Sequence, residues 1–196
     1  MRSDTLGLRK PGMRKLLIAA TGVLLSLAAF LPSEAEVFYN KAAALRLAFP
    51  DAVRVETRAL FLSEDQARRV TDLARAPLES RLVTVYIGQK AGGEVEGYAF
   101  LEQHLIRTKP ETLMVVVDPK GKVGAVYVLA FFEPPEYLPS KRWIKQFIGR
   151  GLSSELQIGR EIQGITGATL STRAILKAVR RALAVHKIMI LPEERQ

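Results

Sequence analysis

The chain has 196 residues, 48% of them apolar and 25% charged, with a formal net charge of +9 at pH 7. These proportions exclude fibrous and intrinsically disordered proteins and fit a single globular domain. Cysteine is absent, which excludes disulfides, cysteine-ligated zinc, iron–sulfur clusters and a cysteine nucleophile, so redox work would need an organic cofactor or a loosely held metal.

Residues 1–35 have the pattern of a secretory signal peptide. Five basic residues precede an apolar run over residues 16–31, and the small residues Ser33 and Ala35 follow it. The run is shorter than the roughly 20 residues that span a bilayer, which favours a leader cleaved after Ala35 over a retained N-terminal anchor. We therefore expect export to the periplasm or to the outer face of the cytoplasmic membrane.

Export changes the meaning of the positive charge. Removing residues 1–35 takes away five basic and two acidic residues, so the net charge falls from +9 to +6. An exported protein is not expected to bind nucleic acid. The remaining charge suits an acidic redox partner or an anionic membrane surface.

Residues 36–80 are expected to form an N-terminal extension made of helices and a strand. A helix is predicted over residues 37–47, a strand over 53–62 and a second helix over 64–75, which Ser63 and Gln66 begin as a capping box. Further along the chain, the pattern predicts strands over residues 81–87, 97–107, 113–117 and 123–131, and helices over 141–148 and 172–186.

Turn residues join these elements. Asp118, Pro119 and Gly121 suit a type I turn, which predicts an antiparallel hairpin around them. Three prolines make residues 133–139 a stiff loop, because proline fixes φ and removes a backbone donor. The fold class expected is α+β, with an antiparallel sheet and packed helices.

The last predicted helix is amphipathic. Its basic residues are expected to form a solvated face, or a docking surface for an acidic cytochrome or an anionic membrane. His186 is expected to be a capping cation at the helix C-terminus, and His104, on a strand, a structural residue. The basic residues are Arg173, Lys177, Arg180, Arg181 and Lys187.

Residues 164–172 read Gly-Ile-Thr-Gly-Ala-Thr-Leu-Ser-Thr and adjoin the start of that helix. Small residues let an anion approach the backbone, and a helix start offers unpaired N–H groups and the positive end of the helix dipole. A hydroxyl there can bind a phosphate or become esterified to one. From the residues alone, the alternative is an ordinary helix N-cap after a glycine turn.

Residues 166–175, Thr-Gly-Ala-Thr-Leu-Ser-Thr-Arg-Ala-Ile, resemble the Ser/Thr-Gly-Ala-Thr-x-Thr-Ser signature of the FMN-binding domain family. That family includes the G subunit of Rnf complexes and the C subunit of sodium-translocating NADH:quinone reductases. Softer matches, at the hairpin, at Glu133-Pro134 and at Trp143 with Phe147, extend the resemblance over about residues 80–187. It implies an FMN-binding domain over residues 81–196 and an α+β fold.

In that family the matching hydroxyl carries FMN through a phosphoester, which an exported flavin transferase installs using FAD and magnesium. The resemblance therefore implies covalent FMN at Ser171, a serine where the family has threonine. Gln163 replaces an acidic residue, which weakens the match to the transferase. Thr172 is the competing acceptor, and noncovalent FMN is a further alternative.

The resemblance also implies which residues surround the cofactor. The isoalloxazine ring needs an apolar wall and a few polar contacts, while the flavin itself supplies the redox chemistry. Core packing is the alternative for Trp143, and no catalytic or metal-ligating residue is expected. The expected cofactor-binding residues are Thr166, Gly167, Ala168, Thr169, Leu170, Ser171 and Thr172, with Phe132, Glu133, Pro134, Tyr137 and Trp143 around the ring.

Two functions stay open at this point. The first is an exported electron carrier that links a membrane oxidoreductase to a cytochrome or another flavin partner, and is not an enzyme by itself. The second is a non-redox binding or assembly module with a decayed flavin site. A free-standing flavin reductase lacks a visible constellation of acid, base and nucleophile.

Overall fold

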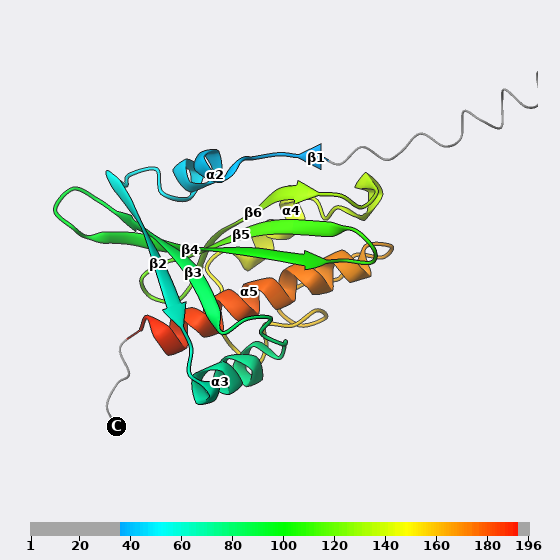
Figure 1. The fold of residues 1–196 in the computed structure, drawn as a ribbon. Coiled ribbons are helices and arrows are strands. Elements are labelled where there is room, and N and C mark those ends of the chain that lie inside the picture. The colour runs from blue at the N-terminus through cyan, green and yellow to red at the C-terminus, as the bar shows by residue number, and fades with distance from the viewer. Residues whose placement is uncertain (1–35, 192–196) are drawn as a thin grey trace, which may run out of the picture. The chain divides into compact units, whose positions relative to one another are not determined.

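The computed structural model describes residues 36–191 (Figure 1). The predicted signal peptide therefore lies outside the described residues. The described chain is α+β, as expected: six strands form one antiparallel sheet in the order β1-β6-β5-β4-β3-β2, and helices pack against it. The strands are β1 (Glu36–Val37), β2 (Arg54–Phe61), β3 (Leu82–Gln89), β4 (Val95–Leu105), β5 (Pro110–Val117) and β6 (Val123–Phe131).

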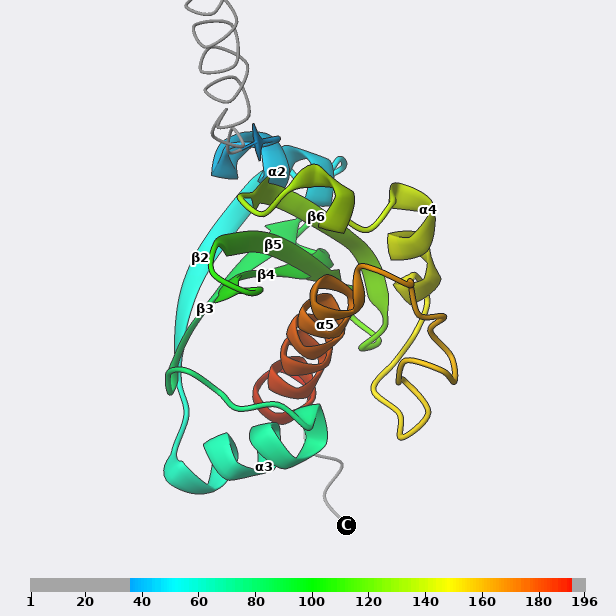
Figure 2. The same ribbon diagram turned by 90° about the vertical axis from the view of Figure 1, so that its right-hand side faces the viewer.

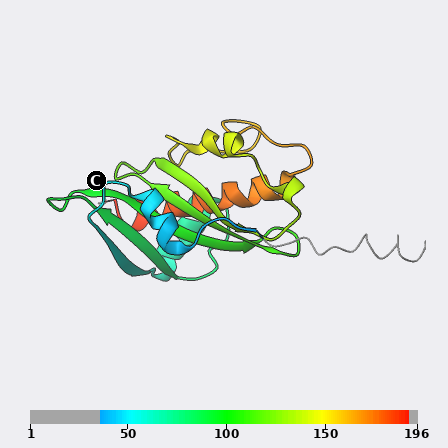
Figure 3. The same cartoon turned by 90° about the horizontal axis from the view of Figure 1, so that it is seen from above.

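Helices cover both faces of the sheet. The long helix α5 (Thr169–Met189) crosses one face beside α3 (Glu64–Ala74), and α2 (Lys41–Ala48) lies over the other face (Figures 1 and 2). Figure 3 looks down on α2, with the strands behind it. The short helix α4 (Lys141–Ile144) continues as a 3-10 turn over Lys145–Phe147, and a second 3-10 turn spans Pro135–Tyr137.

The alternation of β5 divides its side chains between two cores. Val115 and Val117 are fully buried on the side of α3 and α5, whereas Met114 and Val116 pack with Ala44 of α2 on the opposite side. Successive side chains of a strand point to opposite faces. The run of apolar residues in β5 therefore supports both layers.

Local sequence signals account for two of these elements. Ser63 Oγ accepts a hydrogen bond from the N–H of Gln66, and the Gln66 side chain accepts one from the N–H of Ser63, so the predicted capping box is present. The predicted hairpin is also present: the Gly121 N–H donates to the Asp118 carbonyl at 3.0 Å, with Gly121 at a φ of 79°. Such a φ favours glycine.

The first predicted helix is wrong at its start. Glu36 and Val37 pair with Phe131 and Ala130 at the edge of β6 instead of entering a helix. The helix begins at Lys41, because Asn40 caps it by accepting a hydrogen bond from the Ala43 N–H. The predicted last helix also starts earlier, at Thr169.

Two arginines expected on the solvated face of α5 are buried. The guanidinium of Arg180 is covered by α3 and the loop around residue 155, and Arg181 faces β4, where it pairs with Glu102. α5 packs against α3 and against the strands β4, β5 and β6, so its apolar stripe is wider than the sequence suggested. Arg173, Lys177 and Lys187 remain exposed, as expected.

The guanidinium of Arg180 binds only backbone carbonyl oxygens among the described residues. Its nitrogens donate to Leu73 and Ala74 at the end of α3 and to Ser153 and Leu156 in the loop, at 2.6 to 3.0 Å. These carbonyls lie at the negative end of a helix or in a turn, where they can compensate a buried cation. Arg180 therefore joins α3, α5 and the loop.

His186 is buried and His104 is partly buried. His186 is not a capping cation: burial lowers its pKa to about 4, so the ring is neutral at pH 7, and it packs edge-on against Tyr98 with 4.9 Å between ring centroids. His104 lies across from Glu111 on β5, with its Nε2 2.9 Å from Glu111 Oε2. Burial raises the pKa of Glu111.

Candidate functional site

The Thr-Gly-Ala-Thr segment forms the turn that leads into α5 and the first turn of that helix. Gly167 has a φ of 88°, which a residue with a side chain rarely adopts. Thr169 is the first residue of α5, and no side chain caps the helix start. The N–H groups of this first turn have no carbonyl partner within the helix, so they are available to an anion.

A cavity of about 90 Å³ lies at this end of α5. It brings the motif together with the turn between β4 and β5 and with the proline-rich loop. Thr166 and Thr172 are outside its lining, as are Phe132, Glu133, Pro134 and Trp143. The lining residues are Ile106, Arg107, Tyr137, Gly167, Ala168, Thr169, Leu170 and Ser171.

Ser171 stands out among the hydroxyls of the motif. Its side chain is 1% exposed and lines the cavity, yet its Oγ has no hydrogen-bond partner among the described residues. A buried hydroxyl without a partner costs free energy, which a ligand in the cavity could recover. The arrangement leaves the Ser171 oxygen buried and uncommitted beside a helix N-terminus.

Thr172 is equally buried but already engaged. Its Oγ1 donates to the carbonyl of Thr169 at 3.0 Å, and it does not line the cavity. Such back-bonding to the preceding turn is common for threonine in helices. The geometry therefore separates the two candidate acceptors, since only Ser171 offers a free oxygen to the cavity.

Arg107 adds a positive charge to the cavity wall. It lies in the turn after β4, and its guanidinium carbon is 5.7 Å from the centre of the Tyr137 ring, a cation–π contact. Together with the N-terminus of α5, this side chain makes the cavity suited to an anion such as a phosphate.

Glu133, expected at the flavin ring, binds the backbone of this turn. Its Oε1 accepts hydrogen bonds from the backbone N–H groups of Arg107, Thr108 and Lys109, at 2.8 to 3.1 Å. These bonds, that from Thr108 foremost, lower the pKa of Glu133. A negative charge thus holds the turn that carries Arg107, but the carboxylate itself is outside the cavity lining.

Trp143 also lies outside the cavity lining and holds backbone next to the motif. It is 6% exposed and packs edge-on against Phe147, with 5.4 Å between ring centroids. Its Nε1 donates to the carbonyl of Gln163 at 2.5 Å, and the Gln146 side chain accepts a hydrogen bond from the Gln163 N–H. Core packing, the alternative interpretation of Trp143, describes this position. The pair of bonds fixes the segment just before the motif.

Of the loop residues expected at the flavin, only Tyr137 lines the cavity. The Tyr137 N–H donates to the carbonyl of Pro134 at 2.9 Å, so Pro134 starts the turn that places the tyrosine. Ile106 and Arg107 were missed by sequence reasoning. A basic residue in a turn between two strands is common, so the sequence does not single out Arg107. Its place at the cavity becomes evident only when the turn packs against α5.

Within residues 36–191, no helix has both the length and the apolar character needed to cross a bilayer.

Comparisons with known proteins agree with the motif. Residues 107–184 match the model of the FMN-binding domain family, which confirms the resemblance to that family. A segment of 123 residues is 27% identical to the G subunit of the Na⁺-translocating ferredoxin:NAD⁺ oxidoreductase complex of Acetobacterium woodii, covering 54% of this chain and 56% of that relative. The chain thus spans about half the length of the curated relative that it matches.

Among solved structures, the Shewanella oneidensis NqrC crystal structure is similar. The TM-score is 0.49 at 12% identity, over 76% of this chain and 87% of that chain.

The residues at the cavity fit the phosphate end of FMN. The uncommitted Ser171 Oγ, the first N–H groups of α5 and the Arg107 side chain converge there. Serine oxygen, backbone donors and a guanidinium are the groups that bind or esterify a phosphate.

Proposed function

We propose that this protein is an exported flavoprotein that carries electrons, with FMN joined to Ser171 through its phosphate. The observation that carries the proposal is the Ser171 Oγ, buried and without a partner in the wall of an anion-suited cavity. The match of residues 107–184 to the FMN-binding domain family supports FMN as the ligand.

In this proposal each side chain has a defined task. With FAD as the donor, a bond from Ser171 Oγ to the FMN phosphorus would form as the P–O–P bond to AMP breaks, AMP would leave and the hydroxyl proton would go to solvent. The N–H groups of Thr169 and Leu170 would bind the remaining phosphate oxygens. Arg107 neutralises phosphate charge. Tyr137 and the 46% exposed Leu170 lie at the rim, where they would meet the body of the cofactor. Bound FMN supplies one- and two-electron transfer.

The proposed partners and location rest on the matched subunit of Acetobacterium woodii and on the signal peptide pattern of residues 1–35. The matched protein of Acetobacterium woodii is a subunit of a ferredoxin:NAD⁺ oxidoreductase complex. We therefore propose a membrane oxidoreductase or a cytochrome as redox partner, and an exported flavin transferase as the enzyme that attaches FMN. The proposed location is the periplasm or the outer face of the cytoplasmic membrane, reached through the signal peptide of residues 1–35.

A second candidate is a non-redox binding or assembly module. Two observations favour it: the cavity, at about 90 Å³, is smaller than the roughly 300 Å³ at which small-molecule sites begin, and Ser171 is 1% exposed. In that case Gln163 and Ser171 would be marks of a site that no longer receives flavin.

Intact mass separates these candidates. The protein is purified from its own host, denatured and weighed, and the site is mapped by fragmentation. We expect a gain of one FMN less one water on Ser171, lost in Ser171→Ala and kept in Thr172→Ala, the matched control. Transfer of the gain to Thr172 would move the attachment site. An unmodified mass together with a colourless native sample would remove the electron carrier and leave the module.

A further inference from the structure

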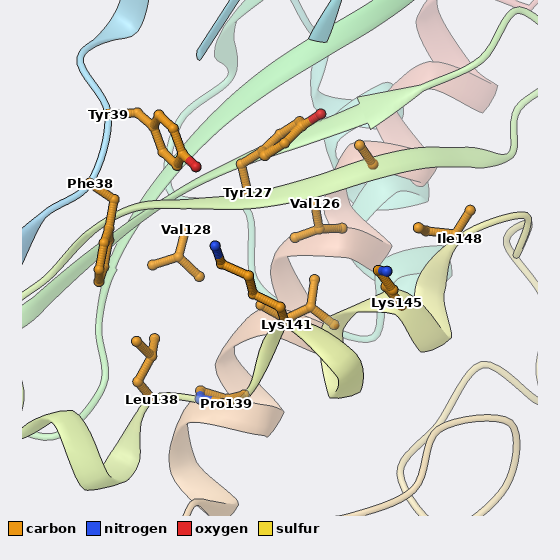
Figure 4. Close-up of a pocket in the computed structure, with 12 residues that line it drawn as sticks. Phe38, Tyr39, Val126, Tyr127, Val128, Leu138, Pro139, Lys141, Lys145 and Ile148 are labelled. Atoms are coloured by element: carbon orange, nitrogen blue, oxygen red, sulfur yellow. The ribbon is translucent and has the colours of Figure 1, made fainter. Parts of the chain in front are cut away.

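A second, larger cavity lies beside residues 125–128 of β6, and Figure 4 shows the side chains that line it. Its volume is about 360 Å³, within the range of roughly 300–1,000 Å³ typical of small-molecule sites. None of its lining residues lines the cavity at Ser171. The segment after β1 forms one wall and α4 with its 3-10 extension forms the other.

The interior of this cavity is apolar. Phe38, Val126, Val128 and Leu138 contribute side chains to it. Tyr127 also lines it, but its hydroxyl is turned to the protein, where it donates to the carbonyl of Leu47 at 3.2 Å. A ligand that fills this space must therefore offer a body of hydrocarbon.

Two ammonium groups stand at the mouth of the cavity. Lys141 and Lys145 are both exposed and one helical turn apart, so they lie on the same side of α4. Figure 4 shows the Lys141 side chain extending across the cavity toward Tyr39. No carboxylate within residues 36–191 forms a salt bridge with either lysine. The complementary ligand is thus an anion joined to a hydrocarbon chain.

The position of the cavity points to the membrane as the source of that ligand. Ile148 lines the cavity and is 50% exposed, and Val37, next to the lining residue Phe38, is 63% exposed, so both extend the apolar surface. Exposed apolar residues ringed by lysines are typical of surfaces that bind anionic lipid.

We propose that this cavity binds an acyl chain of an anionic membrane phospholipid, with the headgroup phosphate between Lys141 and Lys145. The proposal goes beyond the electron-carrier function and does not depend on flavin. It gives the protein a contact with the bilayer made by its folded domain.

The single tryptophan provides the readout. Trp143 stands in α4 between Lys141 and the cavity residue Ile144. Phosphatidylglycerol with brominated acyl chains, presented in micelles of a nonionic detergent, is titrated into the full protein while Trp143 fluorescence is recorded. We expect saturable quenching, at least tenfold weaker in apparent affinity for the double variant Lys141→Glu/Lys145→Glu. Lys177→Glu, an exposed lysine of α5, is the matched control and should behave as wild type.

Titrations with two further brominated lipids identify the source of the ligand. Brominated phosphatidylcholine, which has no net charge, should quench with at least tenfold lower affinity, and brominated stearate tests a free fatty acid. Equal quenching by both phospholipids, no effect of the double variant, or saturable binding of stearate alone would each overturn the proposal. Loss of flavin in the double variant would assign the cavity to the cofactor and overturn it too. Repeating the titration in Ser171→Ala, purified without added FMN, removes the contribution of covalently attached flavin to the quenching.

Discussion

The guanidinium of Arg181 donates two hydrogen bonds to Oε2 of Glu102, at 2.9 and 2.6 Å, across the contact between α5 and β4. Both side chains are largely buried, at 7% and 17% exposure. Burial raises the pKa of Glu102, although Arg181 opposes that effect. The pair fixes how α5 lies along the sheet, and thereby where the start of the helix stands.

Arg181→Met should destabilise the protein by about 3–5 kcal/mol, because it leaves the Glu102 carboxylate buried without its partner. The double variant Glu102→Gln/Arg181→Met should be substantially more stable than Arg181→Met, since no charge then remains unpaired. Urea unfolding of the three proteins measures both effects. A loss below about 1 kcal/mol in the single variant would mean that the pair acts like a surface salt bridge.

His186 should make stability fall in mild acid. Its pKa is about 4 in the folded protein against 6.5 for an unperturbed histidine, so the unfolded chain binds a proton first as the pH falls. Stability is therefore lost progressively between about pH 6.5 and pH 4, by about 3 kcal/mol for the full shift.

His186→Leu should remove this contribution. The difference in unfolding free energy between wild type and variant, followed from pH 7 to pH 4, isolates it from the carboxylates. Glu102 and Glu111 have raised pKa values and favour the folded state as the pH falls, but they are present in both proteins. A difference that stays constant with pH would contradict the prediction.

Glu133→Ala should loosen the turn between β4 and β5. Three backbone N–H groups lose their shared acceptor, which we expect to cost about 1–3 kcal/mol in unfolding free energy. Hydrogen exchange at Thr108 and Lys109 should accelerate with it. Glu136→Ala changes an exposed carboxylate of the same loop and serves as the control. Unchanged exchange in Glu133→Ala would show that the turn holds its shape without the carboxylate.

Arg107→Ala should weaken the phosphate site. In a Ser171→Ala background, where no ester can form at residue 171, we expect noncovalent FMN to bind about tenfold more weakly, a loss of about 1.4 kcal/mol. Isothermal titration with FMN measures the affinity. Lys109→Ala removes a charge from the same turn, outside the cavity lining, and should have little effect. Equal losses in both variants would point to general electrostatic attraction rather than a contact with phosphate.

Local signals in the sequence predicted much of the fold. The capping box at Ser63, the turn at Asp118–Gly121 and the apolar stripe of α5 each depend on residues close together in the chain, and all three are present. The resemblance of residues 166–175 pointed to the FMN-binding domain family, whose model matches residues 107–184.

The sequence did not predict the contacts between segments that lie far apart in the chain. Arg181 meets a residue 79 positions away, and the Arg180 guanidinium binds the carbonyl of a residue 106 positions away, so neither burial could be read from the periodicity of α5 alone. The same holds for Arg107, which joins the motif only through packing. Glu133 and Trp143 were expected at a ligand, whereas their polar atoms hold backbone on which the cavity is built.

The four carbonyl partners of Arg180 should make its contacts insensitive to salt and pH. Carbonyl dipoles carry no proton to gain and no net charge for dissolved ions to screen. The junction of α3, α5 and the loop around residue 155 should therefore keep its strength in high salt and in acid, conditions that weaken pairs with carboxylates. In the proposed extracytoplasmic location, where salt and pH vary more than inside the cell, this junction would be unaffected by such changes.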